Sequence, residues 1–395
     1  MIRAEAGLMT GGGDLDGVVR LRDGVELFSG TLLADGRHVL TAAHGLRGGA
    51  LPRVEFAVPS GILAVPVTAA FVHPLFDPAN GNFDLAIVTL AEPAPLAANR
   101  HEIYRGSDEV GQTAILAGWG LGGTGATGAT GVAATSAPGV AENHFDATVG
   151  ALTDWAAGAL AWSPAANALL LADFDDGTAA HDAAGRLLGL ADTGLGAAEG
   201  LIASGDSGGP ALLNGQIAGV AAYVFSLEQG LTVPDADGVD NNSSFGEFGA
   251  WTRVSVFGQW VDSTARADLP GAPRERADVV RVAAEGDTAT SLAYFLLELS
   301  APAGADGARV AYRTMEGSAH AGEDFLPVAG WSVIYPGESA AVIAVEVVGD
   351  SLVEGDETFG LEITAPQGGS FSHGAIRLVA YRTIADDDAA VSVGG

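Results

Sequence analysis

The ten residues ASGDSGGPAL (203–212) place one hydroxyl and one carboxylate among three glycines and a proline. Glycine is favoured where the backbone needs a positive φ or must approach another group closely. A core strand would not tolerate this run, and a flexible linker would not need the Asp206–Ser207 pair. The run therefore predicts a loop that presents Ser207 as a nucleophile, with bare backbone N–H groups beside it.

Such a nucleophile needs a base and an acid that orients the base. Among eight histidines, His44 follows an apolar run in VLTAAHG, where the chain turns. Asp84 in NFDLAIVTL enters an apolar strand, and a hydrogen bond to a histidine N–H would offset the cost of burying its charge. Considered alone, His44 is most simply interpreted as a structural histidine, and Asp84 as a residue that caps a turn. Taken with Ser207, they indicate a Ser–His–Asp arrangement.

Composition limits the partners of this protein. The 395 residues are 48% hydrophobic, enough for two or three packed domains, and include no cysteine, which excludes disulfides, thiolate metal sites and cysteine nucleophiles. A formal net charge of −31 argues against nucleic acid and anionic membrane surfaces as partners. No apolar run is long enough to cross a bilayer, and the N-terminal segment lacks the features of a signal peptide.

Two β-rich parts follow each other along the chain. Short β-type runs broken by Gly, Pro and Asp, from about residue 17 to 268, predict an all-β barrel or sandwich. The segment DLPGAPRERAD (268–278) is typical of a linker. Seven alternating segments after it predict a β-sandwich. Acids gather at the ends of these segments, and carboxylates that converge there would repel one another without a hard cation such as Ca²⁺.

TAAHG, DLAIV, AGWG and GDSGGP, in that order, resemble the trypsin-like (chymotrypsin-fold, S1-type) serine endopeptidases over about residues 2–267, particularly the bacterial members without cysteine. The resemblance implies an all-β, two-barrel protease domain over 1–268. It implies that Ser207 attacks the scissile carbonyl, that His44 moves the proton and that Asp84 orients His44. The N–H groups of Gly205 and Ser207 would form the oxyanion hole.

The same resemblance assigns further roles. Asp206 would pair with the α-amino group of Ile2, which a retained Met1 would block. Five residues would bind the substrate side chain and backbone: Leu201 as the pocket floor, Val224 and Gly249 at its entrance, and Ala222 and Tyr223 on the neighbouring strand. An apolar floor favours cleavage after small or medium apolar residues.

One acidic segment inside this first domain has two interpretations. ADFDDGTAAHD (172–182) has the acids of a cation-binding loop, but an acidic surface turn is the simpler interpretation.

After the linker 269–278, EGDETF, YRTMEGSAHAGEDF and the terminal DDD resemble the Calx-β domain, an immunoglobulin-like calcium-binding β-sandwich, over 279–390. Glu316 stands where an Asp is more usual in that family. The implied calcium ligands are Glu285, Glu316, Asp350, Glu354, Glu357, Asp386, Asp387 and Asp388.

These observations lead to two expectations about function. The first is a secreted serine endopeptidase that acts on proteins or peptides, needs no cofactor for catalysis and carries a calcium-stabilised accessory domain, as a monomer by default. The second is a non-catalytic adhesion or matrix-binding protein that uses a protease-like scaffold, because a fold alone does not establish an activity.

Overall fold

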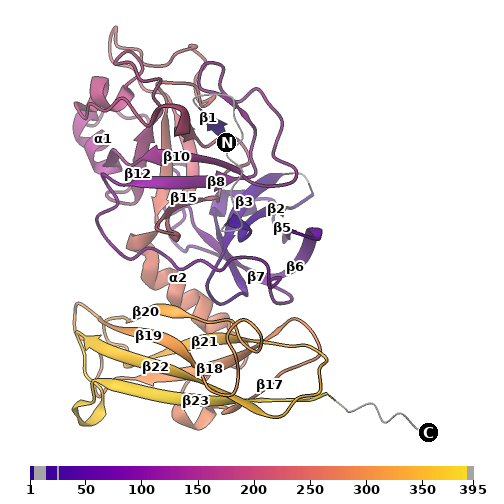
Figure 1. The fold of residues 1–395 in the computed structure, drawn as a ribbon. Coiled ribbons are helices and arrows are strands. Elements are labelled where there is room, and N and C mark those ends of the chain that lie inside the picture. The colour runs from indigo at the N-terminus through magenta and orange to yellow at the C-terminus, as the bar shows by residue number, and fades with distance from the viewer. Residues whose placement is uncertain (4–14, 25, 389–395) are drawn as a thin grey trace. The chain divides into compact units, whose positions relative to one another are not determined.

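The computed structural model describes residues 1–3, 15–24 and 26–388 (Figure 1). The chain divides into two compact units, Met1–Thr264 and Ala265–Gly395. The division lies inside helix α2 (Val254–Asp268), close to the boundary expected at residue 268.

The first unit begins with a closed six-stranded barrel in the order β2-β3-β4-β7-β6-β5. Alternate side chains along a strand face the barrel interior, and Leu21, Phe28 and Phe56 are among those that fill it. The strands are β2 (Val18–Arg22), β3 (Leu27–Leu32), β4 (His38–Thr41), β5 (Arg53–Val58), β6 (Gly61–Val72) and β7 (Ala86–Leu90).

The second half of this unit is a seven-stranded sheet in the order β10-β8-β14-β15-β16-β12-β11. The strands are β8 (Thr113–Gly118), β10 (Gly139–His144), β11 (Ala147–Thr148), β12 (Leu169–Asp173), β14 (Pro210–Leu213), β15 (Gln216–Phe225) and β16 (Phe248–Arg253). A small sheet, β13-β1-β9, joins Gly200–Leu201, Ile2–Arg3 and Gly123–Thr124. Helix α1 (Val149–Ala156) follows β11, and the α2 residues Val254, Phe257 and Val261 pack in the core.

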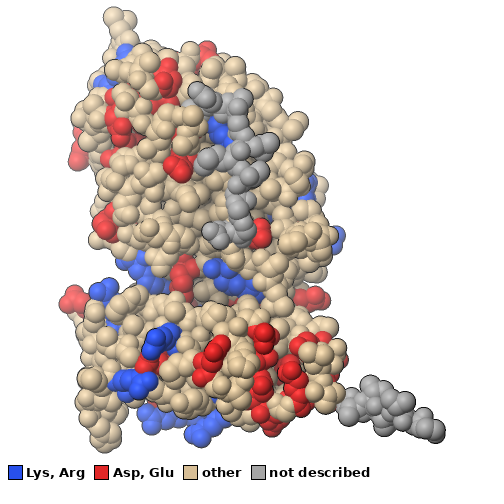
Figure 2. Space-filling model, viewed as in Figure 1, with Lys and Arg blue, Asp and Glu red and all other residues tan. Residues whose placement is uncertain are grey.

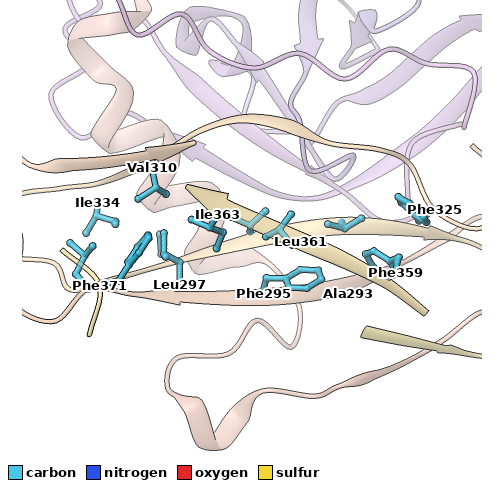
Figure 3. Close-up of a cluster of buried hydrophobic side chains, with 14 of the residues drawn as sticks. Ala293, Phe295, Leu297, Val310, Phe325, Ile334, Phe359, Leu361, Ile363 and Phe371 are labelled. Atoms are coloured by element: carbon cyan, nitrogen blue, oxygen red, sulfur yellow. The ribbon is translucent and has the colours of Figure 1, made fainter. Parts of the chain in front are cut away.

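The second unit is a β-sandwich, as the alternating segments predict. One sheet has the order β17-β23-β22-β19-β20, and β18 pairs with β21 to form the other. Stacked Phe325 and Phe359 rings, with centroids 4.6 Å apart, lie with Phe295 in its core (Figure 3). The strands are β17 (Val282–Ala284), β18 (Thr290–Glu298), β19 (Ala308–Glu316), β20 (Ala329–Ile334), β21 (Ala340–Val348), β22 (Glu357–Gln367) and β23 (Arg377–Ala385).

A buried ion pair fixes the end of β16. The Arg253 guanidinium donates to both carboxylate oxygens of Glu109, at 2.9 and 2.6 Å, and the Ser255 hydroxyl donates to one of them. Burial opposes ionisation of Glu109, but the hydrogen bonds from Arg253 and Ser255 outweigh it and hold its pKa below the usual range. The pair therefore stabilises the fold above the ordinary pKa of a Glu, and this contribution is lost as the pH falls through the lower, folded-state pKa.

Replacing Glu109 with Gln is expected to lower the free energy of unfolding of the first unit by about 3–5 kcal/mol, because Arg253 is left buried without its counter-charge. Calorimetry of the full chain at neutral pH measures the effect. Glu92→Gln, at an exposed position, is the matched control and should leave the transition in place. Equal melting of the two variants would contradict this role of the pair.

Candidate active site

His44 lies in a short 3₁₀ helix, Ala43–Leu46, that starts two residues after β4 ends at Thr41. Strand β4 is held on both sides, by β3 and by β7, so the helix begins from a rigid part of the barrel. The His44 side chain is 28% exposed. It is therefore fixed by the barrel and still accessible to a substrate.

Asp84 precedes β7 and lies behind His44. The residue before it, Phe83, has a φ of 54°, which is unusual for a bulky residue. Its ring stacks on His73 and meets Phe257 edge-on, each with centroids 5.6 Å apart. The resulting bend turns the Asp84 carboxylate toward the helix that carries His44.

The Asp84 carboxylate contacts His44 twice. One oxygen lies 2.6 Å from Nδ1 of the ring, and the other accepts the backbone N–H of His44 at 2.8 Å. The Asp84 side chain is only 3% exposed, so water screens its charge little. An ionised carboxylate can only accept, so Nδ1 carries the proton and Nε2 is left as an acceptor.

Two other histidines also pair with a carboxylate through Nδ1. His38 lies 2.7 Å from Asp35, and His181 lies 2.6 Å from Asp176. The first ring is fully buried, and the carboxylate of the second is partly exposed. Only the His44 pair, among the three, combines a buried acid with an imidazole that borders the cleft described below.

The Ser207 loop reaches across from the second sheet to the first barrel. The backbone carbonyl of Ser207 accepts the N–H of Ser29 at 2.7 Å, and the Ser29 hydroxyl donates to the carbonyl of Gly205 at 2.8 Å. A Cβ on Gly208 would collide with the Thr41 hydroxyl of β4. The loop is thus packed against the strand that leads into His44.

The Ser207 hydroxyl itself forms no hydrogen bond within the described residues, with His44 or any other group. Catalytic hydrogen bonds are often long in free enzymes and tighten when substrate binds. The structure therefore brings His44 and Asp84 into direct contact, and brings the Ser207 loop against the strand beside them.

The glycines of this loop have the conformations that the sequence implied. Gly205 has a φ of +93°, and a Cβ there would lie 2.8 Å from the Cα of Gly120. Gly208 has a φ of +84°. In the part of the chain that the structure describes, the N–H groups of Gly205 and Ser207 donate to no partner. Two unused donors at this place are what an oxyanion hole requires.

With Met1 present, Asp206 still has an ion-pair partner, so the expectation that Met1 would block the ion pair is wrong, while a pair with a freed Ile2 amine stays a prediction. The α-amino group of Met1, rather than that of Ile2, lies 2.8 Å from the Asp206 carboxylate, and both groups are buried. Ile2 is a buried strand residue that pairs with Leu201. Met1 does not block the ion pair because its side chain packs in the apolar core, which places its amine where the Ile2 amine was expected.

An open cleft of about 610 Å³ borders His44 and Asp84. Predicted substrate-binding residues Ala222, Tyr223 and Val224 line it along β15. Burial raises the pKa of Tyr223 to about 12, so its phenol stays neutral. The other lining residues are Arg47, Phe76, Pro78, Asn80, Gly81, Trp162, Phe225, Ser226 and Asn241.

Two predicted pocket residues do not line this cleft. Leu201 is fully buried in the core of the second sheet. A Cβ on Gly249 would lie 2.8 Å from the Leu201 side chain and 2.6 Å from the Trp251 ring. Leu201 and Gly249 are neighbours, as expected, but the Trp251 ring packs against them, and their role in specificity stays a prediction.

Many acids of the second unit gather at one end of the sandwich, where Figure 2 shows a cluster of acidic side chains. Glu285, Asp386 and Asp388 form one group whose ligand oxygens all lie within 4.8 Å of one another. Glu354 and Glu357 form a second such group with Asp324. Sequence reasoning missed Asp324, because it lies in a turn rather than at the end of a strand.

The remaining predicted ligands lie outside these two groups and accept hydrogen bonds from backbone N–H groups. A carboxylate oxygen of Glu316 accepts the N–H of Ala321, and Asp350 accepts that of Leu352. Asp387 accepts the N–H of Gly286.

Electrostatic repulsion is evident in both acidic groups. Burial, followed by the charges of Asp350 and Glu354, raises the pKa of Glu285 to about 7. Burial and a hydrogen bond with Asp324 raise the pKa of Glu357 to about 7. One buried carboxylate oxygen of Asp388 has no hydrogen-bond partner. Oxygen-only ligands, an orphaned carboxylate oxygen and mutual repulsion all fit a Ca²⁺ ion.

Comparisons with known proteins agree with this organisation. Residues 12–148 match the trypsin family model, and residues 279–388 match the Calx-beta domain. A solved structure, the serine protease neuropsin from mouse brain, is similar at 18% identity and a TM-score of 0.46, covering 64% of this chain and 96% of that one. The chain carries a trypsin-like domain of chymotrypsin-like fold followed by a Calx-beta β-sandwich. The trypsin match includes His44 and Asp84 and ends before Ser207.

Neither helix of the described residues has the length and apolar character needed to cross a membrane.

Proposed function

We propose that this protein is a serine endopeptidase that cleaves peptide bonds with Ser207, His44 and Asp84. The observation that carries the proposal is the contact of His44 with a buried carboxylate beside an open cleft. The trypsin family match and the glycine-rich Ser207 loop, with two unused N–H donors, support it.

The chemistry follows from these positions. The Ser207 Oγ attacks the substrate carbonyl while Nε2 of His44 takes its proton, and Asp84 stabilises the imidazolium. The carbonyl oxygen gains charge and accepts from the N–H groups of Gly205 and Ser207. Collapse of this intermediate breaks the C–N bond, and His44 returns the proton to the leaving amine. Water then attacks the acyl-enzyme with His44 as base, releasing the acid and restoring Ser207.

We further propose that the enzyme prefers small or medium apolar side chains before the scissile bond and needs no catalytic cofactor. The apolar residues Ala222 and Val224 along the cleft support this preference. By the resemblance, Leu201 stands at the position where a basic-specific enzyme has an acid, so a bound Arg or Lys would find no counter-charge from this position.

A fluorophosphonate probe tests the nucleophile directly. We expect the wild-type chain to gain one covalent label, found by peptide mass spectrometry on Ser207, and Ser207→Ala to gain none. Ser204→Ala, at an exposed position in the same loop, is the matched control and should be labelled like the wild type. Absence of label from the wild-type chain, or equal labelling of Ser207→Ala, would refute the assignment.

The adhesion alternative predicts a different result. A scaffold without catalysis would bind matrix proteins and leave casein intact, whereas the proposed enzyme degrades casein unless Ser207 is replaced. An intact His44–Asp84 contact favours the enzyme, because a scaffold has no need of it.

We propose that the second domain binds Ca²⁺ through its two acidic groups, that the protein acts as a monomer, and that it works outside the cell. Extracellular calcium-binding modules commonly have dissociation constants of about 10⁻⁴–10⁻³ M, which suits partly exposed carboxylates. Glu285, Asp386 and Asp388 would hold one ion, and Asp324, Glu354 and Glu357 another.

Chelation is expected to lower the melting temperature of the second domain by several degrees, because the carboxylates repel one another without the ion. Calorimetry of the full chain with millimolar Ca²⁺ or with chelator measures this shift. Glu285→Gln should show a smaller shift, and Asp306→Asn, at the opposite end of the sandwich, should behave like the wild type. A second-domain transition that is indifferent to Ca²⁺ would mean that the acids are merely solvated.

A further inference from the structure

A third group of acids lies in the protease-like domain, far along the chain from the Calx-beta domain. Asp173, Asp175 and Asp182 are each more than nine-tenths buried. One oxygen of each lies within 4.8 Å of an oxygen of the other two. The simpler interpretation of 172–182, an acidic surface turn, is therefore wrong for these three residues, because the turn folds inward at the end of β12.

Two of the three carboxylates are partly satisfied by backbone. Asp173 accepts the N–H of Ala184 at 2.7 Å, and Asp182 accepts the N–H of Gly185 at 2.5 Å. Asp175 differs, since no hydrogen bond reaches its carboxylate within the described residues and one of its oxygens is wholly buried. An orphaned buried carboxylate oxygen is costly and requires an explanation.

Among the described residues, the positive charge nearest to this group is that of Arg186, which opposes only in part the rise in the pKa of Asp182. Within the described residues, none of the three carboxylates forms an ion pair with an Arg. Two further acids, Asp146 and Glu199, add to the negative field. Burial and these neighbouring charges raise the pKa of Asp175 to about 10. The cluster is thus strongly disfavoured in its ionised form unless a positive ion joins it.

We propose that Asp173, Asp175 and Asp182 bind a calcium ion inside the protease-like domain. Ca²⁺–oxygen distances are about 2.4 Å, so oxygens bound to one ion lie no more than about 4.8 Å apart, and the three oxygens of this group lie within that limit. Mg²⁺ keeps several of its waters and suits a buried all-carboxylate site less well. The free oxygen of Asp175 supplies the ligand that the backbone does not use.

The position of the site indicates what the ion does. Asp173 ends β12, and its carbonyl and that of Gly200 both accept from the Asn143 amide. Gly200 opens β13, which pairs with β1 beside the buried amine of Met1. The ion would therefore hold the long segment 174–199 to β12, close to β13 and β1 and to the Met1–Asp206 ion pair that adjoins them.

Ion counting on the full, decalcified chain tests the site. Calorimetric titration with CaCl₂ should give one fewer bound ion for Asp175→Asn than for the wild type. A hundredfold excess of Ca²⁺ over its dissociation constant should raise the wild-type first-domain melting temperature by about 5–10 °C, and Asp175→Asn should lose this rise. Asp176→Asn, at the exposed neighbouring position, should match the wild type in both measurements.

Other outcomes would overturn the site. An unchanged ion count in Asp175→Asn, or an equal loss in Asp176→Asn, would leave the three acids as protonated core groups. Asp182→Asn should reproduce Asp175→Asn. If neither variant folds, Glu285→Gln/Glu354→Gln, which disables both groups of the second domain, decides the question: one retained ion supports the site and none refutes it. The number of bound ions is measured independently of peptidase activity. A failure of the calcium-site proposal can therefore be told apart from a failure of the peptidase proposal.

Discussion

Replacing Ser207 with Ala is expected to lower kcat by about 10⁶-fold on a peptide with an apolar residue before the scissile bond. The loss is this large because no acyl-enzyme can form, and the remaining His44 and Asp84 have no hydroxyl to activate. The fold should be kept, since the Ser207 hydroxyl forms no hydrogen bond in the described part of the chain and its carbonyl still accepts from Ser29.

Steady-state kinetics on a fluorogenic peptide measure this effect, with the concentration of active enzyme set by phosphonate titration. Ser204→Ala controls for changes to the loop itself and should retain wild-type kcat. A fall of less than about tenfold in Ser207→Ala would point to another nucleophile and end the triad assignment.

The second large effect is expected at Asp84. Asp84→Asn should reduce kcat by about 10⁴-fold. The backbone N–H of His44 donates to one oxygen of Asp84, so an Asn would keep its carbonyl there and turn its amide toward Nδ1. That amide donates, so the imidazole proton would move to Nε2, and His44 could no longer accept the proton of Ser207.

Asp176→Asn is the matched control for this prediction. It alters another His–Asp pair with the same 2.6 Å separation, between His181 and Asp176, whose residues do not line the cleft. Its kcat should equal that of the wild type. Comparable losses in both variants would mean that the Asp84 effect is structural, and unchanged activity in Asp84→Asn would remove Asp84 from the mechanism.

The sequence predicted the parts of the site that depend on local chemistry. The glycine-rich motif predicted backbone that approaches other groups closely or has a positive φ, and Gly205 and Gly208 do have a positive φ. A lone Asp84 that enters an apolar strand predicted a hydrogen-bond partner, and Asp84 contacts His44. Short motifs were therefore sufficient to predict these two features. The β-sandwich could also be predicted from the sequence. Alternation of apolar and polar residues within a short segment predicts a strand, and this pattern does not depend on distant parts of the chain. These features follow from residues close together in the chain.

What the sequence could not predict depends on long-range packing. Whether Met1 or Ile2 supplies the amine depends on how the first residues enter the core, which residue spacing does not reveal. The burial of Asp173, Asp175 and Asp182 involves distant residues such as Glu199, whose carboxylate accepts the N–H of Asp175. Ser29, which tethers the Ser207 loop, is an ordinary strand serine in sequence, and no local signal distinguishes it.

The hydrogen bonds of Ser29 join the two halves of the first domain. It belongs to the first barrel, while the loop that it tethers belongs to the second sheet, and its hydroxyl also accepts the N–H of Trp119. Two fragments produced by cutting between β7 and β8 would each lack hydrolysis, and would regain it only on reassembling. Substrate turnover in this protein would then serve as a complementation signal, reporting the association of its halves.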